Sequence, residues 1–365
     1  MSEEDPESLA AASRMRARYE PELAAAALTQ ATLRRQAKAK FGESASEMFF
    51  TRPGLEQATR TEVADYHAHR FVQAGVRRVI DIGCGIGSDS MAFARAGLEV
   101  VAVEADPVTA SVAQANLAER AEVICADAGE VAEQLITPGV GVFCDPSRRN
   151  DRGRVWRVED FTPQWSFVMR LLDGRQTAGV KLGPALPHSL IPEAVEAEWI
   201  THRGETVEVA LWAGPGARPG QRSALVMPNA RLAASAAPPP PVRNLGRYLY
   251  EPAGAVIRAG AIAELGAQLG AGLLDSQIAY LTSDSLHETP FATRFVVRQR
   301  LPFHLKALRQ WVRRDHIGVL EIKKRGVEVD PAELRRRLRL AGPRGATIVI
   351  SRTRNGAIAA VVEPI

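Results

Sequence analysis

The sequence predicts an α/β protein whose central domain is built on a parallel sheet. The first indication is a strand-like run that ends in a glycine turn at 79–89, Val-Ile-Asp-Ile-Gly-Cys-Gly-Ile-Gly-Ser-Asp. The second is a series of apolar runs of strand length that alternate with helical segments. The third is a basic α+β pattern after four consecutive prolines at 238–241. Together these features indicate a helical N-terminal segment, a parallel α/β domain and a separate α+β domain.

The first 74 residues are predicted to be helical. Ala, Leu, Glu and Arg recur with helical spacing over 6–40, and a second helical stretch covers 54–74. The break between them carries Phe49 and Phe50, followed by Thr51-Arg52. This aromatic pair either roofs a ligand or stacks on a substrate base, which makes Phe50 a candidate substrate contact, or it packs the helices onto the core. We expect the packing role for at least one of the two rings.

The glycine turn has the pattern of a site for a nucleotide-like ligand. Glycines without Cβ let the chain turn tightly after a strand and approach a ligand closely, and a helix then begins at Ser88 or Asp89. The rhythm from Asp81 is D-x-G-x-G-x-G, whereas dinucleotide sites use G-x-G-x-x-G. An acid at this position suits a ligand with an amino group and a sulfonium better than one with two phosphates. S-adenosylmethionine is such a ligand.

Three further strand-like runs end in an acid. Glu104 follows the run at 100–103, Asp127 follows 121–126, and Asp145 follows 140–144. Because ligands of open parallel sheets bind at the carboxyl ends of the strands, these acids are expected to converge on one crevice with Asp81. Glu104 is placed to accept hydrogen bonds from a ribose, and Asp127 from an adenine amino group.

Residues 75 to about 213 resemble class I S-adenosylmethionine-dependent methyltransferases, and the whole chain resembles the bacterial members with a C-terminal THUMP-like domain. The resemblance rests on the glycine turn and its acids, on the basic tail, and on four further motifs: Met48-Phe49-Phe50-Thr51-Arg52, Leu55-Glu56-Gln57-Ala58-Thr59, Asp145-Pro146-Ser147-Arg148-Arg149 and Val180-Lys181-Leu182-Gly183-Pro184. It implies a Rossmann-like, seven-stranded class I methyltransferase domain. It also implies that Asp145 and Pro146 face the methyl group and the substrate as the catalytic pair. The implied cofactor contacts are Asp81, Gly83, Cys84, Gly85, Gly87, Glu104, Ala105, Asp127, Ala128 and Asp145.

The later elements complete this domain and add another. The segment 177–182 is expected to be the fifth strand, which brings Lys181 close to the site as a substrate contact, and a hairpin around Gly204 closes the sheet. The expected boundaries are 1–74 for the helical segment, 75–232 for the methyltransferase domain, 233–242 for the linker and 243–365 for the last domain.

The C-terminal domain is expected to be a small α+β module of ferredoxin-like or THUMP-like type. Residues 251–280 show short helical patterns, among them 273–281. A β-α-β-α-β-β order then runs from 293 to 363, with the last hairpin turning at Arg354-Asn355-Gly356.

Composition excludes several classes of protein. The chain has 365 residues, of which 46% are hydrophobic, but no uncharged apolar run of membrane-spanning length, and its first residues are acidic. We therefore expect a cytoplasmic enzyme. Three cysteines are too few and too scattered for a disulfide framework or a zinc site. The histidines are scattered as well, so no metal site is expected, and His67 and His69 are expected near solvent.

Charge is distributed unevenly along the chain. From residue 241 onward there are 20 Lys and Arg against 11 Asp and Glu, a balance of +9, while the rest of the chain carries −5. A basic module beside a slightly acidic catalytic domain suggests a polyanionic partner, and a solvated basic helix face is the alternative. The candidate phosphate contacts for RNA are Lys323, Lys324, Arg325, Arg335 and Arg336, with Arg337 and Arg339 beside them.

The methyl acceptor is judged by what each chemistry requires. Carbon-5 pyrimidine methylation needs a thiolate, but Cys144 points back into its strand and Cys84 lies in the cofactor turn. Methylation of a base amine needs an acceptor for the amino group, which Asp145 supplies, although Ser147-Arg148 stands where a second proline and an aromatic ring are usual.

Arg148 and Arg149 are candidate substrate contacts, because a guanidinium can clamp a phosphate, stack on a base or pair with a neighbouring acid. The leading hypothesis is methylation of a base nitrogen in tRNA or rRNA. The alternatives are a methyltransferase for a protein or a small molecule, and a binding protein that has lost catalysis.

Overall fold

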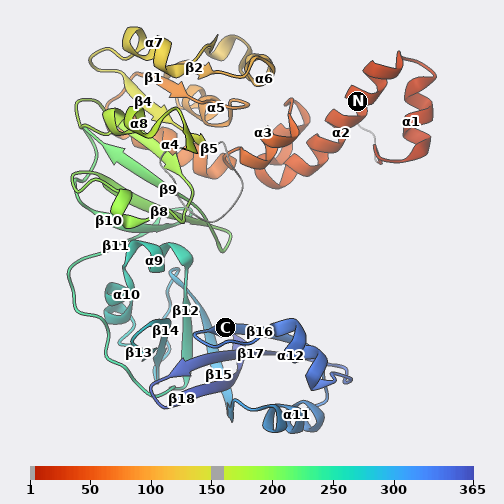
Figure 1. Ribbon diagram of the computed structural model, residues 1–365, viewed down its shortest axis with the longest axis vertical. Helices are drawn as coiled ribbons and strands as arrows, with labels where there is room; N and C mark the ends of the chain where they lie inside the picture. Colours follow the sequence, from red (N-terminus) through yellow and green to blue (C-terminus); the bar gives the residue numbers. More distant parts are fainter. Residues whose placement is uncertain (1–4, 149–159) are drawn as a thin grey trace. The chain divides into compact units, whose positions relative to one another are not determined.

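The structure is a computed structural model, and it describes residues 5–148 and 160–365 (Figure 1). The chain divides into two compact units. The first comprises residues 1–197 and 208–220, and the second comprises 198–207 and 221–365. This division groups 221–232 with the C-terminal part of the chain, whereas the sequence analysis assigned those residues to the domain before the linker. Residues 234–241, within the expected linker, form neither helix nor strand.

The N-terminal part of the first unit is helical, as predicted. Ser8 caps the first helix by accepting a hydrogen bond from the backbone N–H of Ala11, and Pro21 occupies the first turn of the second. Thr51 caps the third helix by accepting from Gly54 N–H. The helices are α1 (Leu9–Arg16), α2 (Pro21–Phe41), α3 (Arg52–Gln57) and α4 (Thr61–Gln73). No helix in the described part of the chain is long and apolar enough to cross a membrane.

The first sheet has the order β11-β10-β8-β9-β7-β4-β1-β2-β3. Its strands are β1 (Arg78–Ile82), β2 (Glu99–Glu104), β3 (Glu122–Cys125), β4 (Gly141–Cys144), β7 (Ala178–Leu182), β8 (Glu196–His202), β9 (Glu205–Ala213), β10 (Arg222–Val226) and β11 (Ala230–Ala233). The pairs from β7 through β4, β1 and β2 to β3 are parallel, while β9 pairs antiparallel with β7. The α/β prediction and the parallel core are therefore confirmed.

The expected number of seven strands in this sheet is too low. The seven expected strands are present, and the antiparallel hairpin of β10 and β11 brings the sheet to nine. These two strands have five and four residues, and polar residues such as Ser223 and Arg231 interrupt their apolar pattern, so they were not recognised in the sequence.

Helices and short connections accompany the strands of the first unit. They are α5 (Ser88–Arg95), α6 (Pro107–Leu117), α7 (Ala128–Leu135) and α8 (Trp165–Leu171), with the two-residue strands β5 (Ser147–Arg148) and β6 (Phe161–Thr162). A buried cluster joins the N-terminal helices to the glycine turn, because Phe41, Phe50 and Leu55 share it with Cys84 and Ile86. The glycine turn is thus packed against residues that precede it by some 30 positions.

The second unit contains a seven-stranded sheet with the order β13-β14-β12-β15-β18-β17-β16. The strands are β12 (Tyr248–Pro252), β13 (Gly272–Asp275), β14 (Ile278–Ser283), β15 (Ala292–Pro302), β16 (Ile317–Arg325), β17 (Arg344–Thr353) and β18 (Gly356–Pro364), with helices α9 (Gly254–Ala259), α10 (Ile262–Gln268), α11 (Leu305–Arg314) and α12 (Pro331–Leu338). The predicted β-α-β-α-β-β order corresponds to β15-α11-β16-α12-β17-β18. The α+β prediction is therefore confirmed.

The helix predicted at 273–281 is wrong. These residues form the β13–β14 hairpin, whose turn is closed by the Asp275 carboxylate accepting from Gln277 N–H at 2.9 Å. A short apolar run is ambiguous between helix and strand, and here pairing with β12 decides in favour of strand. Helices α11 and α12 cover one face of this sheet, with Leu308, Trp311 and Leu334 packed on Leu320 and Ile348.

Candidate active site

The turn between β1 and α5 brings the backbone close to the end of β4. Gly83 and Gly85 have φ of 72° and 56°, in the left-handed region that favours glycine. A Cβ on Gly83 would lie 3.0 Å from the carbonyl oxygen of Asp145, whereas a Cβ on Gly85 would meet no atom within 4 Å. The turn therefore packs closely against Asp145 at Gly83, whereas the space beside Gly85 is open.

The acids predicted at the ends of β2 and β3 lie along the same edge of the sheet. Glu104 accepts from the backbone N–H of Gly85 at 3.0 Å and of Asp106 at 2.9 Å, so its carboxylate ties the end of β2 to the glycine turn. Asp127 is exposed and caps α7 by accepting from Gly129 N–H at 2.7 Å. Because β1, β2 and β3 are parallel neighbours, the predicted convergence of these strand ends agrees with the sheet order. Ala105 and Ala128 directly follow Glu104 and Asp127 at this edge.

Asp81 is buried beneath the turn, with 1% of its surface exposed. Its carboxylate accepts from the Ser90 hydroxyl at 2.5 Å. Burial, reinforced by the nearby Asp89 carboxylate, raises the pKa of Asp81 to about 8. A positive charge nearby would favour its ionised form.

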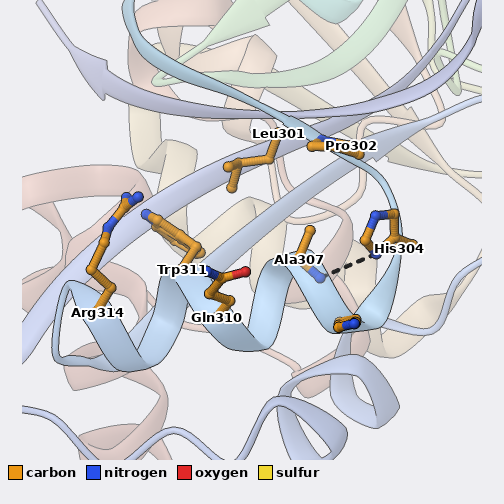
Figure 2. Close-up of a pocket in the computed structure, with 8 residues that line it drawn as sticks. Leu301, Pro302, His304, Ala307, Gln310, Trp311 and Arg314 are labelled. Carbon is orange, nitrogen blue, oxygen red and sulfur yellow. Dashed lines mark hydrogen bonds between the residues drawn. The ribbon is translucent and has the colours of Figure 1, made fainter.

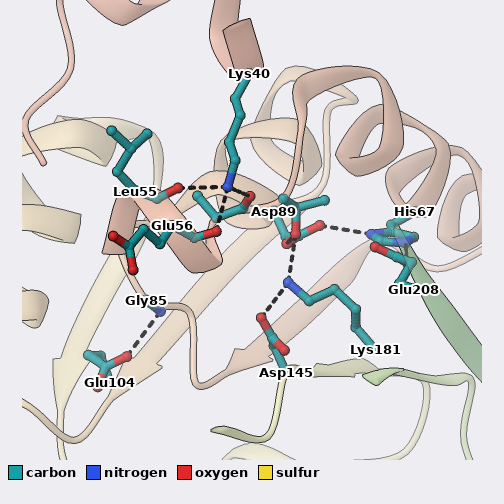
Figure 3. Close-up of polar contacts among 12 residues, drawn as sticks. Lys40, Leu55, Glu56, His67, Gly85, Asp89, Glu104, Asp145, Lys181 and Glu208 are labelled. Carbon is teal, nitrogen blue, oxygen red and sulfur yellow. Dashed lines mark hydrogen bonds and ion pairs between the residues drawn. The ribbon is translucent and has the colours of Figure 1, made fainter. Parts of the chain in front are cut away.

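Asp145 and Lys181 form an ion pair at the ends of β4 and β7. The Lys181 ammonium lies 2.5 Å from Asp145 Oδ2 and donates a second hydrogen bond to Thr59 Oγ1 at 2.8 Å (Figure 3). Burial alone would lower the pKa of Lys181, but the carboxylates of Asp145, Asp89 and Glu208 outweigh it and raise that pKa above its usual value. Lys181 was expected close to the site as a substrate contact, and the structure places its ammonium against Asp145.

His67 lies at the centre of a buried polar chain, and the expectation that it sits near solvent is wrong. Its side chain is fully buried, with Nδ1 2.8 Å from Asp89 Oδ1 and Nε2 2.7 Å from Glu208 Oε1. Burial alone would lower the pKa of His67, but Glu208 and Asp89 raise it to about 10, so the ring is charged at neutral pH. The sequence around His67 does not indicate a buried, charged histidine, because its partners Asp89 and Glu208 come from other elements, α5 and β9.

The buried chain continues from His67 to the ion pair. Asp89 Oδ2 accepts from the Thr59 hydroxyl at 2.6 Å, and Thr59 Oγ1 in turn accepts from Lys181. Side chains from α4, α5, β4, β7 and β9 are thus connected in one network, together with the loop that carries Thr59 (Figure 3). Thr59, His67, Asp89 and Glu208 were all missed as site residues. Thr59 and Asp89 lie within motifs that were recognised, but no role was assigned to them, whereas His67 and Glu208 belong to no motif.

The charges of this site fit a cationic cofactor. Four acids, Asp81, Asp89, Asp145 and Glu208, lie here with two basic groups, His67 and Lys181. The pKa of Asp81 is raised to about 8, because its buried negative charge is costly unless a cation joins it. The sulfonium and ammonium of S-adenosylmethionine are such cations, and the opening at Gly85 gives a ligand access to the backbone. The residues present therefore fit this cofactor.

Other predicted site residues have different surroundings. Phe50 is only 2% exposed and packs on Phe41 at 5.7 Å, so its predicted substrate contact is wrong and it takes the packing role. Phe49 is the exposed ring, with the Arg34 guanidinium 5.0 Å from its centroid. Cys84 and Pro146 are buried.

The structure describes little of the predicted arginine pair. Arg148 pairs through its backbone with Phe161 in the β5–β6 ladder. Arg149 lies outside the described residues.

Gly87, another predicted cofactor contact, precedes α5 as its N-terminal cap. Among the described residues, no group of three or more His, Cys, Asp or Glu is arranged to hold a metal ion.

The basic residues of the second unit lie in two different settings. Lys323 and Arg325 point to the face of β16 away from the helices, where Glu251 lies 2.9 Å and 3.7 Å from them. Lys324 is exposed on the other side of the strand. Arg335 and Arg336 are exposed on α12, although Arg335 also donates to the Leu320 carbonyl at 2.8 Å. The predicted basic clusters therefore do not form one surface.

Helix α11 adds basic residues that the sequence analysis did not single out. It carries Lys306, Arg309, Arg313 and Arg314 without any acid, and Arg309 donates to the Arg337 carbonyl at the end of α12. A hollow of about 450 Å³ lies along this helix, and Figure 2 shows residues that line it. It is lined by Leu301, Pro302, His304, Lys306, Ala307, Gln310, Trp311 and Arg314. Helices α11 and α12 together form the basic helix layer of this unit.

Comparisons with known proteins find relatives for the sheet domain and for the C-terminal domain. Residues 80–134 match a family described as a methyltransferase domain, residues 292–364 match one described as THUMP domain-like, and residues 1–37 match a domain of unknown function. The chain is 34% identical over 344 residues to an uncharacterized S-adenosylmethionine-dependent methyltransferase of Mycobacterium tuberculosis, from strains CDC 1551 and H37Rv. That alignment covers 90% of this chain and 93% of the relative.

A solved structure shows the same fold over nearly the whole length. The crystal structure of a "putative methyltransferase" from Porphyromonas gingivalis W83 covers 99% of this chain and 98% of its own, with a TM-score of 0.77 and 21% sequence identity.

Proposed function

Because this chain belongs to the S-adenosylmethionine-dependent methyltransferases and carries a THUMP-like domain, we propose that it methylates a base nitrogen in tRNA or rRNA. The observation that carries the proposal is the position of Asp145. Asp145 follows the end of β4, its backbone carbonyl lies directly beside the glycine turn, and its carboxylate is held by Lys181. An RNA substrate would place the reaction in the cytoplasm.

The proposed roles of the cofactor residues follow from the hydrogen bonds that their carboxylates and backbone groups can make. Glu104 accepts from the ribose hydroxyls, Asp127 from the adenine amino group, and Asp81 and the open backbone at Gly85 receive the methionine end. S-adenosylmethionine supplies an electrophilic methyl group on a sulfonium. These assignments are supported by the order of the strand ends and by the excess of buried acids.

Asp145 is assigned to the methyl acceptor. Lys181 binds Oδ2 of Asp145, so Oδ1 is the oxygen that orients the N–H of a base. Asp145 would take the proton of the acceptor nitrogen as that nitrogen gains the methyl group, and the sulfur of the cofactor would keep the electron pair of the broken sulfur–methyl bond. Burial raises the pKa of Asp145, although Lys181 opposes this, which makes the carboxylate a better proton acceptor.

The basic helix layer is assigned to the RNA backbone. Arg336 and Arg313 are exposed and lie at the C-terminal ends of α12 and α11. The ammonium of Lys323, by contrast, is held by Glu251. The structure therefore favours the helix layer over the β16 cluster as the phosphate-contacting surface.

Replacing Asp81 with Asn should weaken cofactor binding by about 10-fold to 100-fold, since the hydrogen bonds of a charged group are worth about 1.5–3 kcal/mol. Because the pKa of Asp81 is raised to about 8, binding of a cation at pH 7 should also release a proton. Calorimetry in two buffers of different ionisation enthalpy measures both quantities. Ser147→Ala is the control, because this exposed residue lies outside the assigned cofactor contacts and its substitution should leave both quantities unchanged. Unchanged affinity in Asp81→Asn would refute the assignment.

Replacing Arg313 and Arg336 together with Ala should weaken RNA binding and reduce the slope of log K against log salt concentration by about 2, since each lost phosphate contact removes roughly one unit. The measurement is a filter-binding titration with total tRNA at several salt concentrations. Lys323→Ala is the matched control, because this lysine is engaged by Glu251 and should leave the slope unchanged. If the wild-type protein retains no RNA at low salt, the RNA assignment is wrong.

A further inference from the structure

The Thr59 side chain both accepts and donates a hydrogen bond, which requires a hydroxyl at this position. It lies between α3 and α4 and is 6% exposed. Because an ammonium has only donors, Thr59 Oγ1 accepts from Lys181, and its own hydrogen is donated to Asp89. The hydroxyl therefore bridges a cation and an anion that belong to different elements of the sheet domain.

The chain around Thr59 is held by a lysine from α2. The Lys40 ammonium donates to the carbonyls of Leu55 at 2.7 Å, Glu56 at 2.6 Å and Ala58 at 3.0 Å. These are the carbonyls at the end of α3, which have no partner within their own helix. Lys40 thus fixes the backbone that immediately precedes Thr59 (Figure 3).

Neither residue falls within the family matches. The methyltransferase match covers residues 80–134, and the N-terminal match of unknown function ends at residue 37. These matches therefore assign no role to the motif 55–59 that contains Thr59. The Thr59 hydroxyl nevertheless contacts Lys181, which pairs with Asp145.

We propose that Thr59 is a positioning residue for methyl transfer: its hydroxyl holds Lys181 against Asp145, and Lys40 holds the segment that carries Thr59. The inference rests on the proposed role of Asp145 at the methyl acceptor. A lysine side chain has several rotatable bonds, and a contact with Asp145 alone would leave it free to swing. With Thr59 on its second side, the ammonium and the carboxylate that it binds keep one orientation. An error of about 1 Å in such a group can cost roughly 100-fold in rate.

The test compares Thr59→Val with Thr59→Ser. Valine has the shape of threonine but neither donates nor accepts, whereas serine keeps the hydroxyl. Cell extract from a deletion strain, separated into RNA and protein fractions, is labelled with the tritiated methyl group of S-adenosylmethionine. Thr59→Val should lower kcat by about 10-fold to 100-fold with the KM for S-adenosylmethionine within about threefold, and Thr59→Ser should stay within about threefold of wild type.

A second measurement needs no methyl acceptor. Lysine acylation of the free protein, followed by peptide mass spectrometry, reports how firmly Lys181 is held, with exposed Lys306 as internal reference. Lys181 should react at least about fivefold faster in Thr59→Val and at the wild-type rate in Thr59→Ser, because only valine releases the ammonium. Lys40→Met should give a smaller increase of the same kind.

The outcomes separate this inference from the proposed function. Label in the protein fraction alone overturns the RNA assignment, and the variants are then compared on that fraction. The positioning role is overturned if Thr59→Val keeps wild-type kcat and wild-type Lys181 reactivity. It is also overturned if Thr59→Ser loses as much as Thr59→Val, since the hydroxyl would then not be the cause.

Discussion

Replacing Asp145 with Asn should lower the rate of methyl transfer by about 100-fold to 10,000-fold, because the amide can neither take the proton of the acceptor nitrogen nor pair with Lys181. The measurement is tritiated-methyl transfer to total RNA from a deletion strain, followed by mass spectrometry of the nucleosides. The nucleoside that gains a methyl group identifies the modified base. Cofactor affinity by calorimetry should fall much less than the rate, by at most about tenfold, since Asp145 is only one of four acids that face the cationic cofactor and its proposed role lies at the acceptor.

Ser147→Ala is the matched control for this variant. Ser147 lies two residues further along the same segment and is exposed, and its hydroxyl makes a long contact of 3.5 Å to the Thr162 carbonyl. Its rate should stay within about threefold of wild type, as expected for a surface substitution. If Asp145→Asn retained a rate within about fivefold of wild type, Asp145 would not be the proton acceptor.

Replacing His67 with Leu should reduce the free energy of unfolding by about 3–5 kcal/mol, because removal of one partner leaves buried carboxylates uncompensated. Two acids are affected, since Asp89 and Glu208 bind opposite nitrogens of the ring. Urea denaturation followed by tryptophan fluorescence measures the change. His69→Leu is the control, because His69 is exposed on the same helix.

The effect of His67 should depend on pH in a defined direction. Its pKa in the folded protein is raised to about 10, above the ordinary value of 6.5. The stability that it contributes is therefore fully present below pH 6.5 and is lost as the pH rises through about 10. The stability difference between wild type and His67→Leu should accordingly shrink between pH 7 and pH 10. A difference that stays constant over this range would mean that the ring is neutral in the folded protein.

Local patterns were enough to predict the parallel part of the first sheet. The strands β1, β2, β4 and β7 are mostly buried apolar runs, and the glycine turn, Glu104 and Asp145 lie at the ends of three of them. The β-α-β-α-β-β order of the C-terminal domain was likewise predicted from local apolar patterns. Where runs were short, the prediction was incomplete: β10 and β11 were not recognised, and the β13–β14 hairpin was taken for a helix.

Surface charge was a poorer guide than strand pattern. The sequence places Lys323 and Arg325 next to Lys324, but successive residues of a strand point to opposite faces, and Glu251 from another strand binds the first two. Arg335 and Arg336 lie on a helix beside α11, whose basic residues had not been grouped with them.

The sequence by itself determined the α/β class, the S-adenosylmethionine cofactor and the position of Asp145 at a strand end, and it predicted the outline of the cofactor site. These features depend on residues close together in the chain, whose spacing can be read directly. Only the tertiary structure decided that Phe50 is a core residue and that His67, Thr59 and Glu208 join the site. His67 and Glu208 are 141 positions apart, and no local pattern reports a contact of that separation. What makes His67 a charged site residue is the pair of buried carboxylates that folding places on either side of it.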